Sequence, residues 1–337
     1  MKKMILGYAT SKGLDQMTAQ DALRLTHVNL AFGVIRDGLL SMQGLPRLKE
    51  QLPRLRQFNP SLRFVLSIGG WTAGGFSLMA RTEAGRRAFA ASVERAMDEY
   101  ALDGVDIDWE YPCSDAAGID CDPSDKYNFT LLLQALRDVA GNRIVSIAAG
   151  GGAYFIRDTE MEKVAQILDY VQIMTYDLAT GRSIAAHHTP LYAGDGCVPT
   201  ANADTCVKIY EAAGVSREKL IIGAAFYSRI WHNVESDGGG LGGHADGAAG
   251  FGPEYTELKA RYVDQNGFVR HWDEKARAPY LFNGSTFITY DDPESIAEKC
   301  RYVLREGLRG LMYWEHSCDR SGELLHVISD TLHGKQA

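Results

Sequence analysis

The sequence lacks two kinds of segment that would direct the protein to a lipid or nucleic-acid surface. No apolar run approaches the roughly 20 residues that a membrane-spanning helix needs. No run of Lys and Arg is present either, and 35 basic against 43 acidic residues give a net charge of −8. Because nucleic acids and anionic membranes attract basic surfaces, we expect neither as a partner, and a neutral substrate fits better.

Compact metal-binding motifs are also missing. The sequence contains neither HxH nor HExxH, although it has 9 His. We therefore expect no metal and no cofactor. The chain begins Met1-Lys2-Lys3 and passes directly into an apolar segment typical of a strand, so we expect no signal peptide in this chain.

Cysteine is scarce, but its spacing is informative. Six cysteines form three pairs that are close in sequence: Cys113 with Cys121, Cys197 with Cys206, and Cys300 with Cys318. Local pairs of this kind are typical of disulfides that close loops, which favours an oxidising compartment and a secreted protein whose signal peptide has been removed. The alternative is six unrelated thiols in a cytoplasmic protein.

What the sequence does have is a regular series of carboxylates at residues 103–110, Asp-Gly-Val-Asp-Ile-Asp-Trp-Glu. Successive side chains of a β-strand point to opposite faces, so Asp106, Asp108 and Glu110 share one face. The other face carries the apolar residues Val105, Ile107 and Trp109. The apolar face predicts a buried strand, with Trp109 on its packing side.

Three carboxylates so close together cannot all ionise freely, because like charges raise one another's pKa. One of them is expected to keep its proton near neutral pH, and Glu110 at the end of the strand is the candidate general acid. A divalent-metal site and a solvated edge strand are the alternatives. The missing second ligand motif argues against the metal, and the apolar opposite face argues against the edge strand.

The pattern along the chain predicts a (β/α)8 TIM barrel. With 337 residues and 45% hydrophobic residues, the chain could hold two domains or one large α/β barrel. Eight short apolar runs predict strands at residues 4–10, 27–34, 64–70, 104–110, 144–149, 170–177, 220–227 and 310–315. Between them, helical periodicity predicts helices at residues 83–100, 125–140, 159–168 and 293–306. In this fold, catalytic residues lie at the carboxyl ends of the strands.

The alternation of strand and helix fails after the seventh run. Residues 228–290 are too many for one connection, and they combine a glycine-rich segment with aromatic, strand-like pieces. We expect a small α+β insertion between strands 7 and 8, with residues 1–231 and 291–337 forming the barrel and residues 232–290 the insertion. At the catalytic face, it would build one wall of a groove.

Further motifs end the other predicted strands, and together they resemble the chitinases of glycoside hydrolase family 18 over nearly the whole chain. They are SIGGW at 67–71, DGVDIDWEYP at 103–112, QIMTYD at 172–177, YSR at 227–229 and MYWE at 312–315. The insertion resembles the chitinase insertion domain. Two positions depart from the family pattern: Ser228 stands where the family often has glycine, and strand one lacks a Trp that commonly follows the position of Tyr8.

The resemblance implies a retaining, substrate-assisted mechanism in which the 2-acetamido oxygen of the sugar attacks the anomeric carbon. Glu110 would protonate the glycosidic oxygen and later deprotonate water. Asp108 would hydrogen-bond the acetamido N–H and stabilise an oxazolinium ion, with Asp106 behind it sharing its proton. Tyr176 would hold the acetamido carbonyl.

The resemblance also implies a set of substrate-binding residues. These are Tyr8, Phe32, Ser67, Gly70, Trp71, Met174, Asp177, Tyr227, Arg229 and Trp314. Trp314 would be the floor under the distorted sugar, Ser67 would hydrogen-bond the inner aspartates, and Trp231 and Trp272 would extend an aromatic track. The alternatives are a packed core Trp at 314, a small turn residue at 67 and a surface-paired Arg at 229.

The expected partner is therefore chitin or a chitooligosaccharide, bound by a monomer. The rival enzyme is an endo-β-N-acetylglucosaminidase acting on N-glycan cores, which shares the carboxylate series; the insertion and Trp314 favour a chitinase. The alternative without catalysis is a chitin-binding lectin of the same fold. In such lectins the acidic residue is typically replaced, whereas this chain keeps Glu110, which argues against a lectin. Endo or exo action, and crystalline or soluble substrate, stay open.

Overall fold

The computed structural model describes residues 2–194, 198 and 200–334. Its centre is a closed barrel of eight parallel strands, in which β1 pairs with β2 on one side and with β14 on the other. The strands are β1 (Met4–Ala9), β2 (His27–Arg36), β4 (Arg63–Gly69), β5 (Gly104–Asp108), β6 (Ile144–Gly150), β7 (Tyr170–Met174), β8 (Leu220–Ala225) and β14 (Gly310–Trp314). The predicted (β/α)8 barrel is confirmed. A short strand, β3 (Leu39–Ser41), pairs antiparallel with β2.

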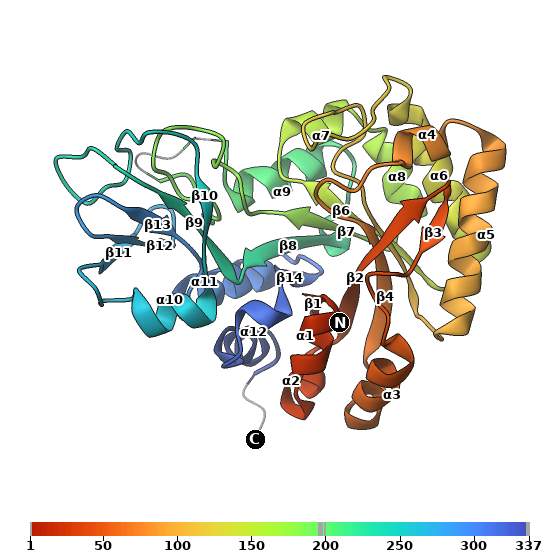
Figure 1. The fold of residues 1–337 in the computed structure, drawn as a ribbon, viewed down its shortest axis with the longest axis horizontal. Helices are drawn as coiled ribbons and strands as arrows, with labels where there is room; N and C mark the ends of the chain where they lie inside the picture. The colour runs from red at the N-terminus through yellow and green to blue at the C-terminus, as the bar shows by residue number, and fades with distance from the viewer. Residues whose placement is uncertain (1, 195–197, 199, 335–337) are drawn as a thin grey trace.

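Helices cover the outside of the barrel (Figure 1). They are α1 (Ser11–Gln16), α2 (Ala19–Arg24), α3 (Leu48–Phe58), α4 (Phe76–Ala80), α5 (Glu83–Glu99), α6 (Asp125–Ala140), α7 (Ala153–Arg157), α8 (Met161–Ile167), α9 (Ala203–Ala212), α11 (Pro293–Arg305) and α12 (Glu323–His333). The 3-10 turns η1 (Arg217–Lys219) and η2 (His316–Cys318) precede β8 and α12. The four predicted helices correspond to α5, α6, α8 and α11. None of the described helices is both long and apolar enough to span a membrane.

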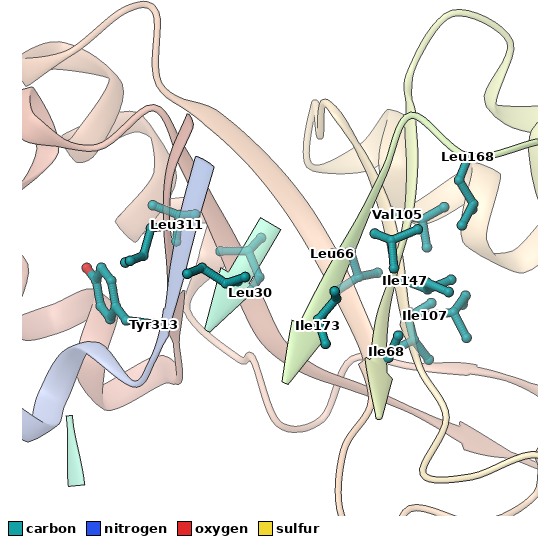
Figure 2. Close-up of a cluster of buried hydrophobic side chains, with 14 of the residues drawn as sticks. Leu30, Leu66, Ile68, Val105, Ile107, Ile147, Leu168, Ile173, Leu311 and Tyr313 are labelled. Carbon is teal, nitrogen blue, oxygen red and sulfur yellow. The ribbon is translucent and has the colours of Figure 1, made fainter. Parts of the chain in front are cut away.

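The hydrophobic core lies between the barrel strands and these helices. Figure 2 shows Val105 and Ile107 of β5 gathered with apolar side chains of the neighbouring strands. Trp109 is buried in the same layer and stacks on Phe76 of α4, with ring centroids 5.1 Å apart. The alternation of β5 therefore sends its apolar residues outward, as predicted, and its carboxylates into the barrel.

A second sheet lies between β8 and β14 in the sequence. It is antiparallel, in the order β10-β9-β13-β12-β11. Its strands are β9 (Tyr227–Trp231), β10 (Gly250–Glu254), β11 (Val269–Asp273), β12 (Ala278–Phe282) and β13 (Phe287–Thr289), and α10 (Tyr255–Arg261) follows β10. Figure 1 shows this unit beside the barrel. The division of the chain at residues 232–290 stays a prediction.

A buried ion pair lies where the chain leaves the second sheet. Lys299 of α11 donates to Asp291 at 2.6 Å, and both side chains are fully buried. The same carboxylate accepts from the backbone N–H of Ala225, at the end of β8, at 3.0 Å. Asp291 therefore joins the two points at which the chain enters and leaves the second sheet.

The expected disulfides are not formed among the described residues. Five cysteines are described, and all are unbonded: Cys113, Cys121, Cys206, Cys300 and Cys318. Cys197 lies outside the described residues. Two of the thiols contact oxygens: Cys113 Sγ lies 3.7 Å from the carbonyl oxygen of Pro123, and Cys318 Sγ lies 3.7 Å from Glu315 Oε1. The disulfide prediction is wrong for Cys113 with Cys121 and for Cys300 with Cys318, and the pair that includes Cys197 lies partly outside the described residues. Secretion stays a prediction without this support.

We predict that Lys299→Met destabilises the protein by about 3–5 kcal/mol, because it leaves the Asp291 carboxylate buried and unpaired. Chemical denaturation should measure the loss. Arg261→Ala is the matched control, because Arg261 pairs with Glu257 on the surface, where its side chain is 70% exposed. That variant should change stability by less than about 1 kcal/mol. Similar losses in both variants would contradict a special role for the buried pair.

Candidate active site

Asp106 lies at the centre of a row of polar side chains that crosses three strands. The strand register sets Ser67 of β4 and Ser146 of β6 directly beside Asp106 of β5. Paired residues point to the same face of a sheet, so all three enter the barrel. Both serine hydroxyls donate to the Asp106 carboxylate, from Ser67 at 2.8 Å and from Ser146 at 2.7 Å.

Three more donors reach Asp106 from other parts of the barrel. Tyr8 Oη lies 2.9 Å from Oδ2, Asn29 Nδ2 lies 3.2 Å from Oδ2, and Gln172 Nε2 lies 2.8 Å from Oδ1. Burial raises the pKa of Asp106, while its hydrogen bonds oppose that rise. The carboxylate is an interior acceptor that is already occupied by protein donors, which makes it a poor metal ligand.

Asp108, two residues further along β5, lacks the hydrogen-bond donors that surround Asp106. Its side chain is buried, and its Oδ1 has no hydrogen-bond partner. Burial raises the pKa of Asp108 well above its usual value, and the neighbouring charges of Glu110 and Asp106 raise it further. The buried surroundings of Asp108 therefore favour its protonated form, and its Oδ1 is left without a partner in the protein.

Glu110 lies just beyond the end of β5. The pKa of Glu110 is raised to about 7: burial is the largest cause, a hydrogen bond with Tyr111 opposes the rise, and the charge of Asp177 adds to it. A carboxyl group with this pKa can both donate and accept a proton near neutral pH. The role of Glu110 as the general acid stays a prediction.

Aromatic side chains surround Glu110 on one side. Tyr111 packs edge-on against Trp71, at 6.4 Å between centroids, and against Tyr154 of α7, at 5.2 Å. Trp71 is 55% exposed, which leaves its ring open to a ligand. The glycines around Tyr154 make room for it, because a Cβ at Gly150 would lie 2.3 Å from its hydroxyl oxygen.

Trp314, at the end of β14, belongs to a second aromatic group inside the barrel mouth. It stacks on Phe32, with centroids 5.3 Å apart and an angle of 18°, and it lies 5.6 Å from Tyr8. Met174 packs in the same cluster. Gly70 has φ 93°, and a Cβ there would lie 2.8 Å from the Phe32 ring, so only glycine leaves the stack undisturbed.

Tyr176 follows β7 and lies near the carboxylates. Its hydroxyl has a weak contact with the Met312 sulfur at 3.8 Å. Burial raises the pKa of Tyr176 well above its usual value, followed by the charges of Asp108 and Glu110, so the phenol stays neutral. A neutral phenol without a strong acceptor is available to donate to a ligand.

Asp177 is a charged anchor beside this group. Its backbone has φ 58°, and its carboxylate accepts two bonds from Arg229 at 2.6 Å each and one from Tyr227 at 2.8 Å. His188 Nδ1 lies 3.2 Å away. Burial alone would raise the pKa of Asp177, but hydrogen bonds from His188 and Arg229 outweigh it and hold the pKa below its usual value. Asp177 is ionised, and Arg229, whose side chain is 12% exposed, pairs with it inside this group and not on the surface.

The structure thus brings together the predicted residues around Asp106, Glu110, Trp314 and Asp177, but the aromatic track was placed wrongly at one position. Trp231 is buried, and its Nε1 donates to the carbonyl of Arg182 at 2.9 Å, so it belongs to the core of the second sheet. Trp272 lies on β11, the edge strand furthest from β10, and its contact is with Arg270.

Several functional side chains were missed from the sequence. They are Asn29, Ser146, Tyr154, Gln172 and His188. Polar residues at inward positions of otherwise apolar strands are the signal that could have found Asn29, Ser146 and Gln172. Tyr154 and His188 lie in loops and short helices, where no periodicity indicates direction.

Comparisons with known proteins agree with this geometry. The model of the family "Glycosyl hydrolases family 18" matches residues 4–319. Chitinase A1 of Niallia circulans is 39% identical over 310 residues, which cover 84% of this chain and 44% of that protein. Chitotriosidase-1 of Mus musculus is 31% identical over 310 residues, covering 86% of this chain and 66% of that protein. The chain therefore spans less than half the length of Chitinase A1.

Among solved structures, a family 18 N-acetylglucosaminidase from Paenibacillus barengoltzii superposes with a TM-score of 0.94 at 48% identity, covering 98% of this chain and 99% of that one. Chitinase ChiW from Paenibacillus sp. str. FPU-7 superposes with a TM-score of 0.88 at 37% identity, covering 98% of this chain and 43% of that one. The barrel, the carboxylate series and these matches agree, and the chain belongs to family 18 of the glycoside hydrolases.

Proposed function

We propose that the protein hydrolyses β-1,4-linked N-acetylglucosamine polymers or oligomers, as a chitinase with a retaining, substrate-assisted mechanism. The observation that supports this best is the Asp108 carboxyl group. It is buried between Asp106, whose oxygens are occupied by protein donors, and Glu110, and its own Oδ1 has no partner in the protein. A direct carboxylate nucleophile would need an ionised oxygen, and the raised pKa of Asp108 disfavours that form. Relatives named chitinases support the same substrate class.

In the first step, the acetamido oxygen of the sugar attacks the anomeric carbon and the glycosidic bond breaks. Glu110 gives its proton to the leaving oxygen. In the second step, water attacks the same carbon, its proton returns to Glu110, and the cyclic intermediate opens. The pKa of about 7 lets one side chain perform both proton transfers.

The acetamido group needs two partners. Asp108 has a free oxygen for the acetamido N–H, and this contact orients the group and stabilises the positive charge of the oxazolinium ion. Asp106, held behind it by its five donors, can share the Asp108 proton. Tyr176 donates its phenol hydrogen to the acetamido carbonyl and holds it for attack.

The remaining residues position the sugar. Trp314, backed by Phe32, offers an aromatic face to the C–H face of the pyranose. Asp177, Tyr227 and Arg229 form a hydrogen-bonded unit suited to sugar hydroxyls. We further propose that a monomer acts on chitin or chitooligosaccharide, with neither nucleic acid nor membrane as a partner, in keeping with the net charge of −8.

A second candidate is an N-acetylglucosaminidase that releases single sugars, which the likeness to the Paenibacillus barengoltzii enzyme favours. Both activities use the same chemistry at Glu110 and Asp108. They differ in how many sugars bind on each side of the cleavage point, and therefore in the length of their products.

The first prediction concerns pH. A general acid must be protonated, so kcat/KM should fall as pH rises through about 7, the pKa of Glu110. Tyr111→Phe removes a hydrogen bond that lowers this pKa, so the falling limb should move to higher pH. Initial rates on a soluble oligosaccharide across the pH range measure both effects. A limb that moves to lower pH would contradict the assigned role of Tyr111.

The second prediction concerns the acid itself. Glu110→Gln keeps the shape of the side chain but cannot protonate the leaving oxygen, so kcat should fall by about 100-fold or more while oligosaccharide binding persists. Calorimetric titration measures the binding. Asp108→Asn should also lose activity by orders of magnitude without loss of fold, and normal turnover in either variant would refute its role.

The third prediction tests the function through its products. Defined N-acetylglucosamine oligomers should be cleaved, whereas a chitobiose-core glycopeptide should not. NMR of the nascent product should show the β-anomer, because two inversions restore the configuration. Fully deacetylated chitosan, which lacks the acetamido nucleophile, should resist. A nascent α-anomer would mean direct attack by water. Product masses separate a chitinase from an enzyme that releases only single sugars.

A further inference from the structure

A large apolar side chain stands exposed on the second sheet, close to the active site. Phe251 of β10 is 75% exposed, more than Trp71 at 55%. In the register of the sheet it faces Arg229 of β9, so both side chains lie on the same face. Arg229 is itself bound to Asp177. Phe251 thus lies directly beyond the charged anchor of the site.

The Arg229 guanidinium packs against the Phe251 ring. The guanidinium carbon of Arg229 lies 3.6 Å from the ring centroid, within the range of a cation–π contact. Because two hydrogen bonds hold Arg229 on Asp177, the arginine cannot turn away freely. Tyr227 is a second neighbour of the ring, but 75% of the residue is exposed, so the ring can stack on a ligand.

Ser228, which stands where the family often has glycine, helps to hold β10 in place. Ser228 is fully buried, and its hydroxyl donates to the carbonyl of Pro253 at 2.7 Å, which fastens β10 to β9 on the C-terminal side of Phe251. Gly252 lies against it, because a Cβ at 252 would be 2.4 Å from Ser228 Oγ. A glycine at 228, which the family often has, could not make this bond.

Aromatic rings connect this platform to the catalytic centre. Tyr176 contacts Tyr227, with centroids 6.1 Å apart, and Tyr227 contacts Phe251, at 6.2 Å. A sugar chain leaving the cleavage point past Asp177 would pass Arg229 and then meet the open ring. The C–H faces of N-acetylglucosamine suit such a ring, and no charged group need be desolvated.

We propose that Phe251 forms a further subsite, which stacks a sugar beyond the disaccharide that spans the cleavage point, and that Ser228 sets its position. This inference rests on the proposed function and deepens it, because it names the residue that would favour longer substrates over shorter ones. Longer oligomers gain the contact, whereas the disaccharide does not reach it.

The test compares Phe251→Ala, Phe251→Leu and Phe251→Tyr on the disaccharide and the hexasaccharide of N-acetylglucosamine. For the Ala and Leu variants, kcat/KM on the hexasaccharide should fall about tenfold, chiefly through KM, while the disaccharide value changes less than about twofold. Phe251→Tyr keeps the ring and should behave like wild type. Ser228→Gly should weaken hexasaccharide cleavage in the same selective way.

Leu304→Ala is the matched control, since Leu304 is an exposed apolar residue, 44% exposed, on α11. It should change neither substrate. Calorimetric binding of the hexasaccharide to each variant in a Glu110→Gln background gives a readout without turnover. Equal losses on both substrates, no loss on either, or the same loss in Leu304→Ala would overturn the inference. If wild type cleaves no oligomer, the proposed function fails, and selective loss of hexasaccharide binding would still support the subsite.

Discussion

The burial of the Asp106 carboxylate in the barrel is the constraint on which the active site depends. A carboxylate inside a protein is costly unless donors replace its lost water. Here six strands are not free to slide past each other, because Ser67, Ser146, Tyr8, Asn29 and Gln172 all converge on this one group. Asp108, two residues further along β5, receives none of these five donors, and burial together with the charges of Glu110 and Asp106 raises its pKa.

Much of this arrangement could be predicted from local pattern. The period of two in residues 103–110 indicates which side chains of β5 face inward, and the alternation of strands and helices indicates the barrel. The donors to Asp106 could not be predicted in the same way, since Asn29 and Gln172 lie 143 positions apart in sequence and meet only through the barrel's closure. Nothing in a single strand reports which distant strand will lie opposite.

Two errors have the same origin. The cysteine pairs are close in sequence, but Cys113 and Cys318 turn toward oxygens, so spacing did not indicate side-chain direction. Trp231 carries the residue type of a sugar platform, but it is buried, whereas the less conspicuous Phe251 is exposed. Composition indicates what a side chain can bind, and only the fold decides whether it is accessible.

The anchor at Asp291 has a consequence for how such an enzyme can diversify. Because this carboxylate ties the end of β8 to the start of α11, the chain departs from the barrel and returns to it at almost the same place. Segments between these two points can lengthen, shorten or change sequence without moving the strands that carry Asp106, Asp108 and Glu110. Changes in these segments can therefore reshape the surroundings of the three carboxylates while the carboxylates themselves keep their positions.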